Sequence, residues 1–379
     1  MQLSVIILNY NVRYFLELCV SSVHKAIANL DAEIIVVDNN SSDDSCAMMK
    51  QQFPTVQFIQ NNDNVGFPKG NNIGVAKAKG DYICILNPDT VVAEDTFEKV
   101  LAFAQKQSDL GIVGCKLIDG TGNFLPESKR GIPTPWVAFT KIFGLYTWFP
   151  KSMLFNKYYA QHLNENQSGK VDILVGAFMV MKRELYLDIG GFDEDCFMYS
   201  DDIDLSYMAL KKGKSNYYFH ESTVIHYKGE STVRDGAYMK RFREAMQFFY
   251  KKHFRQSILF DWMMLLGSIV FSIIKKNQQL NRPFFPNETI LFSKDLVSIK
   301  YGVGVHTYTK FEALTINPTS NYELVFDVQS FSFLEIITYM HKIKAKNITF
   351  RMFLPKSNFI LGSNHANDRG IITNLSKLE

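Results

Sequence analysis

The chain has 379 residues, of which 46% are hydrophobic and 21% charged, which is enough for one large domain with appendages or for two domains. The formal net charge is only +3, so the composition gives no sign of a nucleic-acid partner. The five cysteines are scattered and form no Cys-x-x-Cys pair, which argues against a disulfide framework and against a zinc site. Positive charge is concentrated at residues 237–255, which hold six Lys or Arg and one Glu.

The first 120 residues alternate short β-branched runs with amphipathic stretches. Strands are expected at residues 4–8, 33–37, 56–60 and 82–86, and helices at 12–29, 43–52 and 70–78. Continuous apolar strands separated by helices indicate a mainly parallel sheet covered on both faces, an α/β architecture of the doubly wound type. The N-terminus has no basic segment and no small-residue cleavage site, so we expect a cytoplasmic protein.

Polar residues follow three of the expected strands. They are Asn9-Tyr10-Asn11, Asp38 with the Asn/Ser run after it, and Asn87-Pro88-Asp89. Ligands of such sheets bind at the carboxyl ends of the strands, so these residues mark the expected binding edge. No G-x-G-x-x-G follows the first strand and no Gly-rich G-x-G-x-R opening occurs. Both absences argue against other nucleotide-binding enzymes, a dehydrogenase and a sugar-phosphate nucleotidyltransferase respectively.

The region after residue 236 combines basic and apolar character. Residues 241–274 are expected to be helical, and the apolar run 257–274 lies between the lysine pairs 251–252 and 275–276. The run is marginal for a spanning helix, and its basic–apolar–basic order suits a helix lying in the membrane interface. A buried core helix is the alternative.

A linker is expected at residues 281–286, followed by a small α/β unit. Its elements are a strand at 323–328, a helix at 332–345 and a strand at 347–354, and no chemistry attaches to them. The expected domains are therefore 1–235, 236–280 and 287–379.

Seven short motifs follow one another along the first 226 residues. They are VIILNYN at 5–11, VVDNNSSD at 36–43, NVGFPKGNNIG at 64–74, LNPDT at 86–90, GGFD at 190–193, SDDIDL at 200–205 and IH at 225–226. In this order and spacing, residues 1–231 resemble glycosyltransferase family 2 with the GT-A fold, in particular its rhamnosyltransferase branch. The resemblance implies an inverting enzyme that moves a sugar from a nucleotide-diphosphate donor to an acceptor hydroxyl.

The resemblance also implies which residues bind the donor. These are Asn9, Tyr10, Asp38, Lys69, Asn87 and Asp89. Asp38 would accept hydrogen bonds from the base and the ribose while Tyr10 stacks on the base. An Asx turn at Asp38 is the alternative, and both can hold together. The glycine-rich stretch 66–72 places backbone amides and Lys69 where phosphate can bind, although a plain turn explains the glycines equally well.

The LNPDT motif falls where the family carries a DxD-type metal motif. A bound Mg²⁺ or Mn²⁺ stabilises the leaving diphosphate there. Because Asn87 replaces the first carboxylate, Asp89 is the expected ligand, and His226 completes the metal shell in this interpretation. A structural role is the alternative for His226.

The acidic cluster at 201–204 occupies the position of the family's Glu-Asp-x-Asp motif. Its second residue, Asp202, is the expected base, while Asp201 replaces the glutamate that contacts the acceptor. Like charges raise the pKa of a carboxylate, which suits a base working near neutrality. The alternative is an acidic first turn that complements a helix dipole. Met208 stands where many relatives carry Arg, so one phosphate or acceptor contact is missing.

The resemblance finally implies a pathway and a place in the cell. We expect a bacterial enzyme of cell-surface polysaccharide, O-antigen or capsule synthesis, which uses dTDP-rhamnose or a UDP-sugar. Its acceptor would be carried on a polyprenyl-diphosphate lipid, and the enzyme would lie on the inner face of the plasma membrane. Because Asn87, Asp201 and Met208 depart from the family pattern, a non-catalytic sugar-nucleotide-binding scaffold is the alternative.

Overall fold

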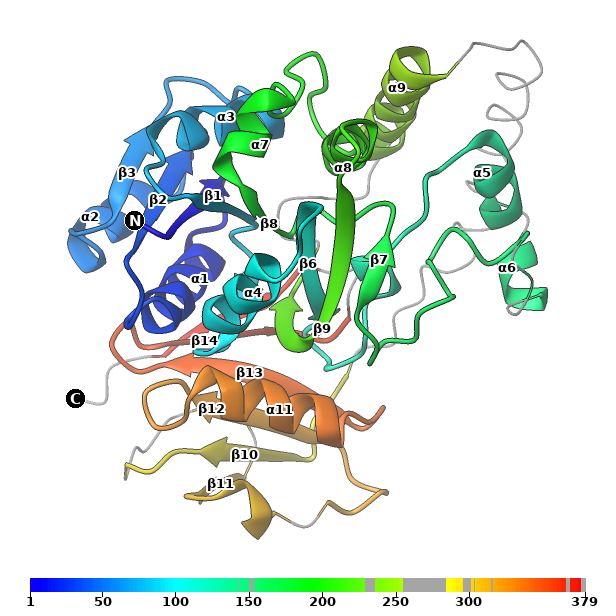
Figure 1. Ribbon diagram of the computed structural model, residues 1–379. Coiled ribbons are helices and arrows are strands. Elements are labelled where there is room, and N and C mark those ends of the chain that lie inside the picture. The colour runs from blue at the N-terminus through cyan, green and yellow to red at the C-terminus, as the bar shows by residue number, and fades with distance from the viewer. Residues whose placement is uncertain are drawn as a thin grey trace.

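The computed structural model describes residues 1–142, 144–149, 152, 154–228, 236–254, 284–295, 301–302, 304–314, 316–365 and 369–375. Two sheets organise these residues, a nine-stranded one and a six-stranded one (Figure 1). The apolar run 257–274, for which we expect an interfacial helix, lies outside the described residues. Within the described part of the chain, no helix is long and apolar enough to cross a bilayer.

The large sheet is mixed and has the strand order β3-β2-β1-β4-β8-β6-β9-β5, with β7 paired to β9. Its strands are β1 (Leu3–Asn9), β2 (Ala32–Asp38), β3 (Gln57–Gln60), β4 (Tyr82–Leu86), β5 (Thr90–Val91), β6 (Leu110–Ile118), β7 (Gly169–Val171), β8 (Phe178–Lys182) and β9 (Ser215–His226). The first four in this order run parallel, and β8 is antiparallel to both of its neighbours, β4 and β6.

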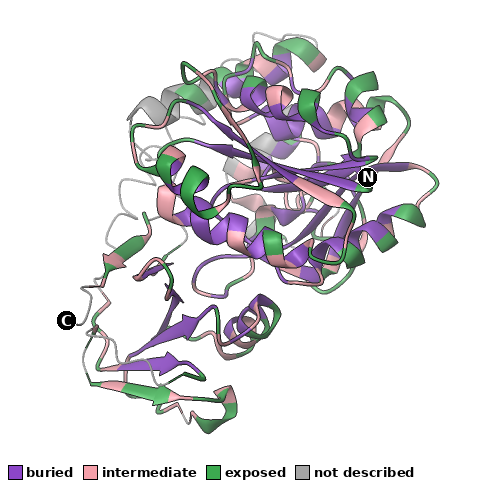
Figure 2. Ribbon diagram, turned by 90° about the vertical axis from the view of Figure 1, so that its left-hand side faces the viewer, coloured by how far each residue is buried: buried purple, intermediate pink, exposed green. Residues whose placement is uncertain are grey.

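Helices cover both faces of this sheet. On one face pack α1 (Arg13–Ala26), α2 (Ser45–Gln52) and α4 (Thr96–Gln105), and on the other α3 (Phe67–Lys77), α7 (Arg183–Asp188) and α8 (Asp201–Lys211). Every residue of β1 and β4 is buried, because alternate side chains enter the two opposite hydrophobic clusters. The expected α/β fold with its mainly parallel half is confirmed, and Figure 2 shows the buried strands between layers of helix.

The remaining helices lie beside the sheet or beyond it. They are the short 3₁₀ helix η1 (Pro126–Ser128), then α5 (Pro135–Ile142), α6 (Leu145–Trp148) and α9 (Gly236–His253). In Figure 1, α5 and α6 stand at the right-hand edge, and α9 stands next to α8 at the top.

The C-terminal unit is a six-stranded sheet with a helix on one face. Its elements are β10 (Glu288–Phe292), β11 (Val305–Tyr308), η2 (Phe311–Ala313), β12 (Tyr322–Asp327), α11 (Phe333–Ile343), β13 (Ile348–Leu354), β14 (Phe359–Ser363) and β15 (Ile371–Asn374). The strand order is β11-β10-β12-β13-β14-β15. Among these described strands, the pairs β13–β14 and β14–β15 are antiparallel and the other pairs are parallel. The expected strand, helix and strand are found at β12, α11 and β13, and the other four strands enlarge the small α/β unit.

The two units share one hydrophobic cluster. Phe15 from α1 and Tyr227 after β9 pack in it together with Phe326 and Phe350 of the C-terminal sheet. Polar contacts cross the same boundary. The carboxylate oxygens of Glu94 accept hydrogen bonds from the first two backbone N–H groups of α11, each at 2.9 Å. A carboxylate at a helix N-terminus satisfies otherwise unpaired donors and complements the helix dipole.

Candidate active site

Asn9 and Asp38 stand opposite each other at the carboxyl ends of β1 and β2. The Asn9 side chain donates a hydrogen bond to Asp38 at 2.7 Å, and the Ser41 hydroxyl and N–H donate to the two carboxylate oxygens at 2.6 and 2.8 Å. Asp38 is fully buried by these contacts. Its carboxylate therefore forms the turn that fixes the loop after β2. The expected contact of Asp38 with a nucleobase remains a prediction, as does stacking on the exposed Tyr10.

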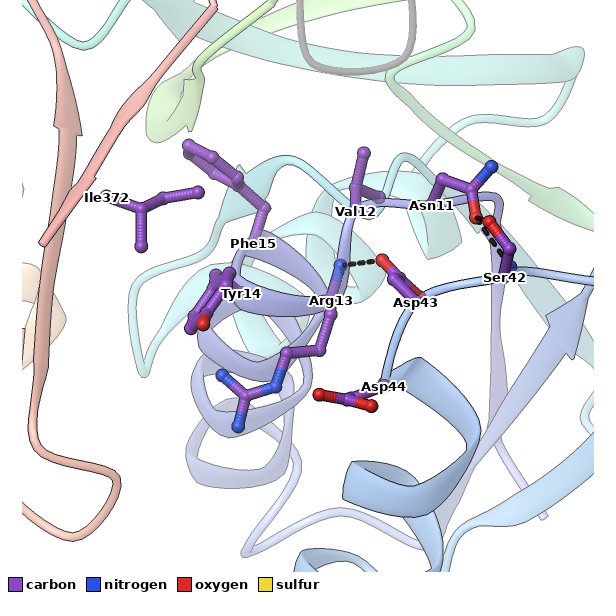
Figure 3. Close-up of a pocket in the computed structure, with 9 residues that line it drawn as sticks. All are labelled: Asn11, Val12, Arg13, Tyr14, Phe15, Ser42, Asp43, Asp44 and Ile372. Carbon is purple, nitrogen blue, oxygen red and sulfur yellow. Dashed lines mark hydrogen bonds between the residues drawn. The ribbon is translucent and has the colours of Figure 1, made fainter. Parts of the chain in front are cut away.

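An open pocket of about 460 Å³ lies at the seam between the two units, beside this loop (Figure 3). It is lined by residues 11–15 from the start of α1, by residues 42–44 before α2, and by Ile372 of β15. Asn11 accepts a hydrogen bond from the backbone N–H of Ser42 at 2.7 Å, and Asp43 accepts one from the N–H of Arg13 at 3.0 Å. The C-terminal unit thus supplies one wall of a pocket near the carboxyl ends of β1 and β2.

The glycine-rich stretch forms the turn into α3 and its first residues. Gly66 has a φ of +84°, and a Cβ there would lie 2.9 Å from the Phe197 ring. At Gly70 a Cβ would lie 2.4 Å from Leu8 of β1. The two glycines are therefore explained by a left-handed turn and by close helix–strand packing. Lys69 is exposed in the first turn of α3, where it remains available to a phosphate.

Asn87, Asp89 and His226 come together where β4 ends and β5 pairs with the end of β9. Asp89 Oδ1 lies 3.4 Å from His226 Nε2, which is 3.5 Å from Asn87 Nδ2. Asn87 Oδ1, Asp89 Oδ1 and His226 Nδ1 are buried and have no hydrogen-bond partner among the residues that the structure describes. Unpaired buried polar atoms are costly, so three of them in one place indicate a site built for a ligand.

This donor set fits a divalent cation that also has ligands from outside the protein. Within the described ranges, no three His, Cys, Asp or Glu side chains converge on one point. Asp89 offers a carboxylate oxygen, His226 a ring nitrogen and Asn87 an amide oxygen. Mg²⁺ and Mn²⁺ in phosphate-binding sites are held by one or two carboxylates together with phosphate oxygens and waters.

Asp201 and Asp202 open α8 and are both largely buried. The Asp202 carboxylate accepts a hydrogen bond from the guanidinium of Arg130 at 2.5 Å and another from the backbone N–H of Gly176 at 3.1 Å. Burial, and after it the negative charge of Asp202, raise the pKa of Asp201 to about 7. The raised pKa that suits an acid or base near neutrality is therefore found at Asp201, while Asp202 is held by a cation.

One short backbone segment connects the two polar clusters. The Gly176 N–H binds Asp202, and the carbonyl of the next residue, Ala177, accepts a hydrogen bond from the backbone N–H of Asn87 at 3.0 Å. Consecutive Cα atoms are about 3.8 Å apart. The cluster of Asn87, Asp89 and His226 and the acidic pair at the start of α8 are therefore connected through two consecutive residues, Gly176 and Ala177.

The third acid of the motif has a different environment. Asp204 is buried and binds α9, accepting hydrogen bonds from Lys252 at 2.9 Å and from His253 at 2.5 Å. Lys252 also pairs with Asp193 at 2.6 Å. Within α9, Met246, Phe249 and Tyr250 pack against α8. Lys252, one of the lysines that precede the apolar run 257–274, is therefore paired with two acids of the fold. The interfacial helix itself remains a prediction.

Sequence reasoning missed three residues that shape the site. Arg130 lies 72 positions before its partner Asp202 in the chain, and no motif marks it. Gly176 allows close approach, since a Cβ there would lie 3.3 Å from that of Asp202. Tyr199 has a φ of +80°, which is unusual for a bulky residue and stands directly before the acidic turn.

Comparison with known proteins identifies a family for the domain that carries this site. The family model described as glycosyl transferase family 2 matches residues 4–190, which include the ends of β1, β2 and β4. The chain carries a family 2 glycosyltransferase domain. With the family established, the mixed sheet flanked by helices is the GT-A arrangement that the resemblance implied.

The curated relatives include two rhamnosyltransferases. The glycosyltransferase domain is 25% identical over 215 residues to N-acetylglucosaminyl-diphospho-decaprenol L-rhamnosyltransferase of Mycobacterium tuberculosis, covering 54% of this chain and 69% of that protein. It is 26% identical over 222 residues to rhamnosyltransferase WbbL of Escherichia coli, covering 54% and 78%. Among solved structures, a mannosyltransferase of Pyrobaculum calidifontis in complex with GDP-Man and Mn²⁺ is 16% identical with a TM-score of 0.48, covering 73% and 75%.

Proposed function

We propose that the chain is an inverting glycosyltransferase that transfers a sugar from a nucleotide-diphosphate donor to an acceptor hydroxyl. The observation that carries the proposal is the pairing of two clusters across residues 176–177. One cluster presents three buried polar atoms, at Asn87, Asp89 and His226, that have no hydrogen-bond partner within the described part of the chain. The other is the buried acidic pair Asp201 and Asp202. A nucleotide-sugar transferase needs a diphosphate site and a base in such proximity.

In this proposal each of the two acids at the start of α8 has its own task. Arg130 and the Gly176 N–H fix one oxygen of Asp202, so the carboxylate stays oriented and its second oxygen can take the proton of the acceptor hydroxyl. Asp201 binds the acceptor by hydrogen bonding. A single displacement from the face opposite the diphosphate inverts the anomeric centre.

The departing diphosphate requires charge stabilisation at the other cluster. A bound Mg²⁺ or Mn²⁺ would supply it as a Lewis acid, held by Asp89, His226 and the Asn87 amide oxygen. Lys69 at the start of α3 is exposed and adds a positive charge for phosphate. Asn9 and Asp38 keep the loop of the nucleoside site in shape, and Tyr10 offers an exposed ring for stacking on the base.

The relatives support a narrower form of the proposal. Two of them are named rhamnosyltransferases, and one name specifies an N-acetylglucosaminyl-diphospho-decaprenol acceptor. We therefore propose dTDP-rhamnose or a UDP-sugar as donor and a polyprenyl-diphosphate-linked glycan as acceptor, in bacterial cell-surface polysaccharide, O-antigen or capsule synthesis. Such an acceptor places the enzyme at the inner face of the plasma membrane.

The test combines donor binding with turnover. Wild type should bind one of dTDP-rhamnose, UDP-hexose or UDP-N-acetylhexosamine in titration calorimetry and transfer its sugar. Asp202→Asn should bind that donor with nearly unchanged affinity and lose ~10²–10⁴ in turnover, the usual contribution of a positioned base. Asp188→Asn, which removes an exposed acid paired with Lys212, is the control and should keep wild-type turnover.

Three outcomes would contradict parts of the proposal. Near wild-type turnover of Asp202→Asn would show that Asp202 is not the base. Donor binding without turnover in wild type supports the non-catalytic scaffold instead. Failure to bind any of the sugar nucleotides refutes the donor class.

A further inference from the structure

The segment 131–160 differs in composition from the rest of the chain. It holds nine aromatic residues and three lysines, and it has no Asp or Glu. It contains α5 and α6, which Figure 1 shows at the edge of the molecule, away from the C-terminal sheet. We call this segment the aromatic excursion.

The two ends of the aromatic excursion are joined next to the acidic pair. The Gly131 N–H donates to the carbonyl of Tyr158 at 3.1 Å. The Lys129 ammonium donates to the carbonyls of Tyr159 and Ala160 at 3.0 and 3.1 Å. Between these closures lies Arg130, whose guanidinium binds Asp202. The excursion therefore begins and ends beside the proposed base.

Four large apolar side chains of the excursion are exposed. Trp148 is 79% exposed, Leu154 63% and Phe149 50%, and Trp136 is exposed as well. Phe155 lies between Trp136 and Phe149, with ring centroids 5.9 and 5.4 Å away. The Trp136 indole donates a hydrogen bond to the carbonyl of Leu154 at 3.0 Å. Single exposed apolar residues are ordinary, whereas a contiguous ordered group marks an interaction surface.

The charge and side-chain types of this surface select an anionic bilayer as its occupant. Tryptophan partitions to the boundary between headgroups and acyl chains, because an indole combines an apolar body with a polar N–H. Phenylalanine and leucine are typical of the apolar face of elements that lie in this boundary. Lysines without neighbouring acids favour anionic headgroups. Lys141 lies 3.6 Å from the centroid of the Tyr158 ring, and Lys157 is exposed.

We infer that the aromatic excursion is a membrane-docking element that inserts Trp148, Phe149 and Leu154 into the surface of an anionic bilayer. The inference deepens the proposed function and rests on its lipid-linked acceptor. With its two ends beside Arg130, the excursion sets the acidic pair at a fixed position relative to the bilayer surface. The hydroxyl of an acceptor whose diphosphate lies at headgroup level then reaches Asp202 without leaving its membrane.

The experiment measures the binding of the full chain to vesicles of phosphatidylcholine with and without phosphatidylglycerol. Wild type should bind the anionic vesicles, and part of the binding should persist at high salt, because salt screens the lysines and not the apolar insertion. Trp148→Ser with Phe149→Ser should weaken the partition coefficient by roughly 10- to 100-fold. The matched control is Phe285→Ser with Leu187→Ser, since those side chains are 71% and 54% exposed. The control should bind like wild type.

A second variant tests insertion directly. Trp148→Phe keeps an aromatic side chain and should keep vesicle binding, while the quenching of tryptophan fluorescence by brominated lipid should fall. Unchanged quenching would overturn the insertion of Trp148. Equal vesicle binding by the two double variants, or no binding of wild type at any salt, would overturn the docking element.

Two measurements separate this inference from its alternatives. If Trp148→Ser with Phe149→Ser turns a dimer into a monomer in ultracentrifugation and leaves vesicle binding unchanged, the surface joins two copies of the chain and the inference is wrong. Transfer to a short, water-soluble acceptor should be equal in wild type and this double variant. Loss of vesicle binding in the double variant together with intact soluble transfer supports docking. If wild type transfers no sugar to the water-soluble acceptor, that result contradicts the proposed function and leaves the vesicle-binding result to decide on the docking element.

Discussion

Replacing Arg130 by Gln removes the only cation that contacts the acidic pair among the described residues. The Arg130–Asp202 pair is buried, since each side chain is 12% exposed and the two atoms are 2.5 Å apart. Removing one partner of a buried ion pair leaves the other charge uncompensated, which costs about 3–5 kcal/mol. Arg130 also donates to the carbonyl of Leu174 at 3.1 Å, and that bond is lost as well. We therefore expect the free energy of unfolding of Arg130→Gln to fall by about 4 kcal/mol.

The same substitution should change the pH dependence of transfer. Without the guanidinium, the Asp202 carboxylate loses the positive charge that stabilises it, and the loss of a neighbouring cation raises the pKa of a carboxylate. A base must be unprotonated to accept a proton, so the acidic limb of the pH–rate profile should move to higher pH. A purely structural role of Arg130 would lower stability without moving this limb.

Urea unfolding and a double-mutant cycle with Asp202→Asn test this reasoning. The cycle should give a coupling energy of about 2–3 kcal/mol, because residues in one buried pair do not act additively. Lys212→Gln serves as the control, since it removes an exposed pair with Asp188 and should change stability far less. A coupling energy below about 0.5 kcal/mol together with an unshifted pH–rate profile would refute the proposed action of Arg130.

Three further predictions concern single carboxylates. Asp89→Ala should abolish the dependence of donor binding on Mg²⁺ or Mn²⁺ in calorimetry, and full wild-type activity in excess chelator would contradict the metal site. Asp201 keeps a proton in the folded state up to a pKa of about 7, so the stability that it contributes is complete below pH ~4 and is lost as the pH rises to 7. The free energy of unfolding of Asp201→Asn, measured relative to wild type, should therefore be more favourable at pH 8 than at pH 4 by up to about 4 kcal/mol. Urea midpoints of variant and wild type that change in parallel with pH would argue against this. Glu94→Ala should lower the free energy of unfolding by about 1–2 kcal/mol, because the first two N–H groups of α11 lose their acceptor although the Ser332–Glu335 capping box remains, and an unchanged urea midpoint would exclude that role.

The central half of the fold could be predicted from the sequence because its strands are buried on both faces. A run such as that of β1 or β4 is apolar at every position, and helices with a 3.6-residue period separate such runs. The C-terminal sheet was only partly predictable. Its central strands β12 and β13 have the same apolar character, whereas β15 is exposed along most of its length and carries little periodic signal.

The candidate site was predictable where topology alone assembles it. Asn9, Asp38 and Asn87 follow parallel strands, so the sheet brings them to one edge. Arg130 was not predictable, because its contact with Asp202 joins segments 72 residues apart and depends on tertiary packing. The partners of Lys252 were not predictable either, because packing of α9 against α8 brings this lysine to Asp193 and Asp204.

The hydrophobic cluster shared by the two units determines how the chain unfolds. Phe15 packs edge-on against Tyr227, with centroids 5.1 Å apart, and both enter the core that holds the C-terminal sheet together. Tyr227 directly follows His226, and Phe15 lies in the first turn of α1. A protease cut between residues 228 and 284 would therefore not release an independent transferase domain. The two sheets should melt in one cooperative calorimetric peak, and a donor that binds at the first sheet should raise the melting temperature of the second.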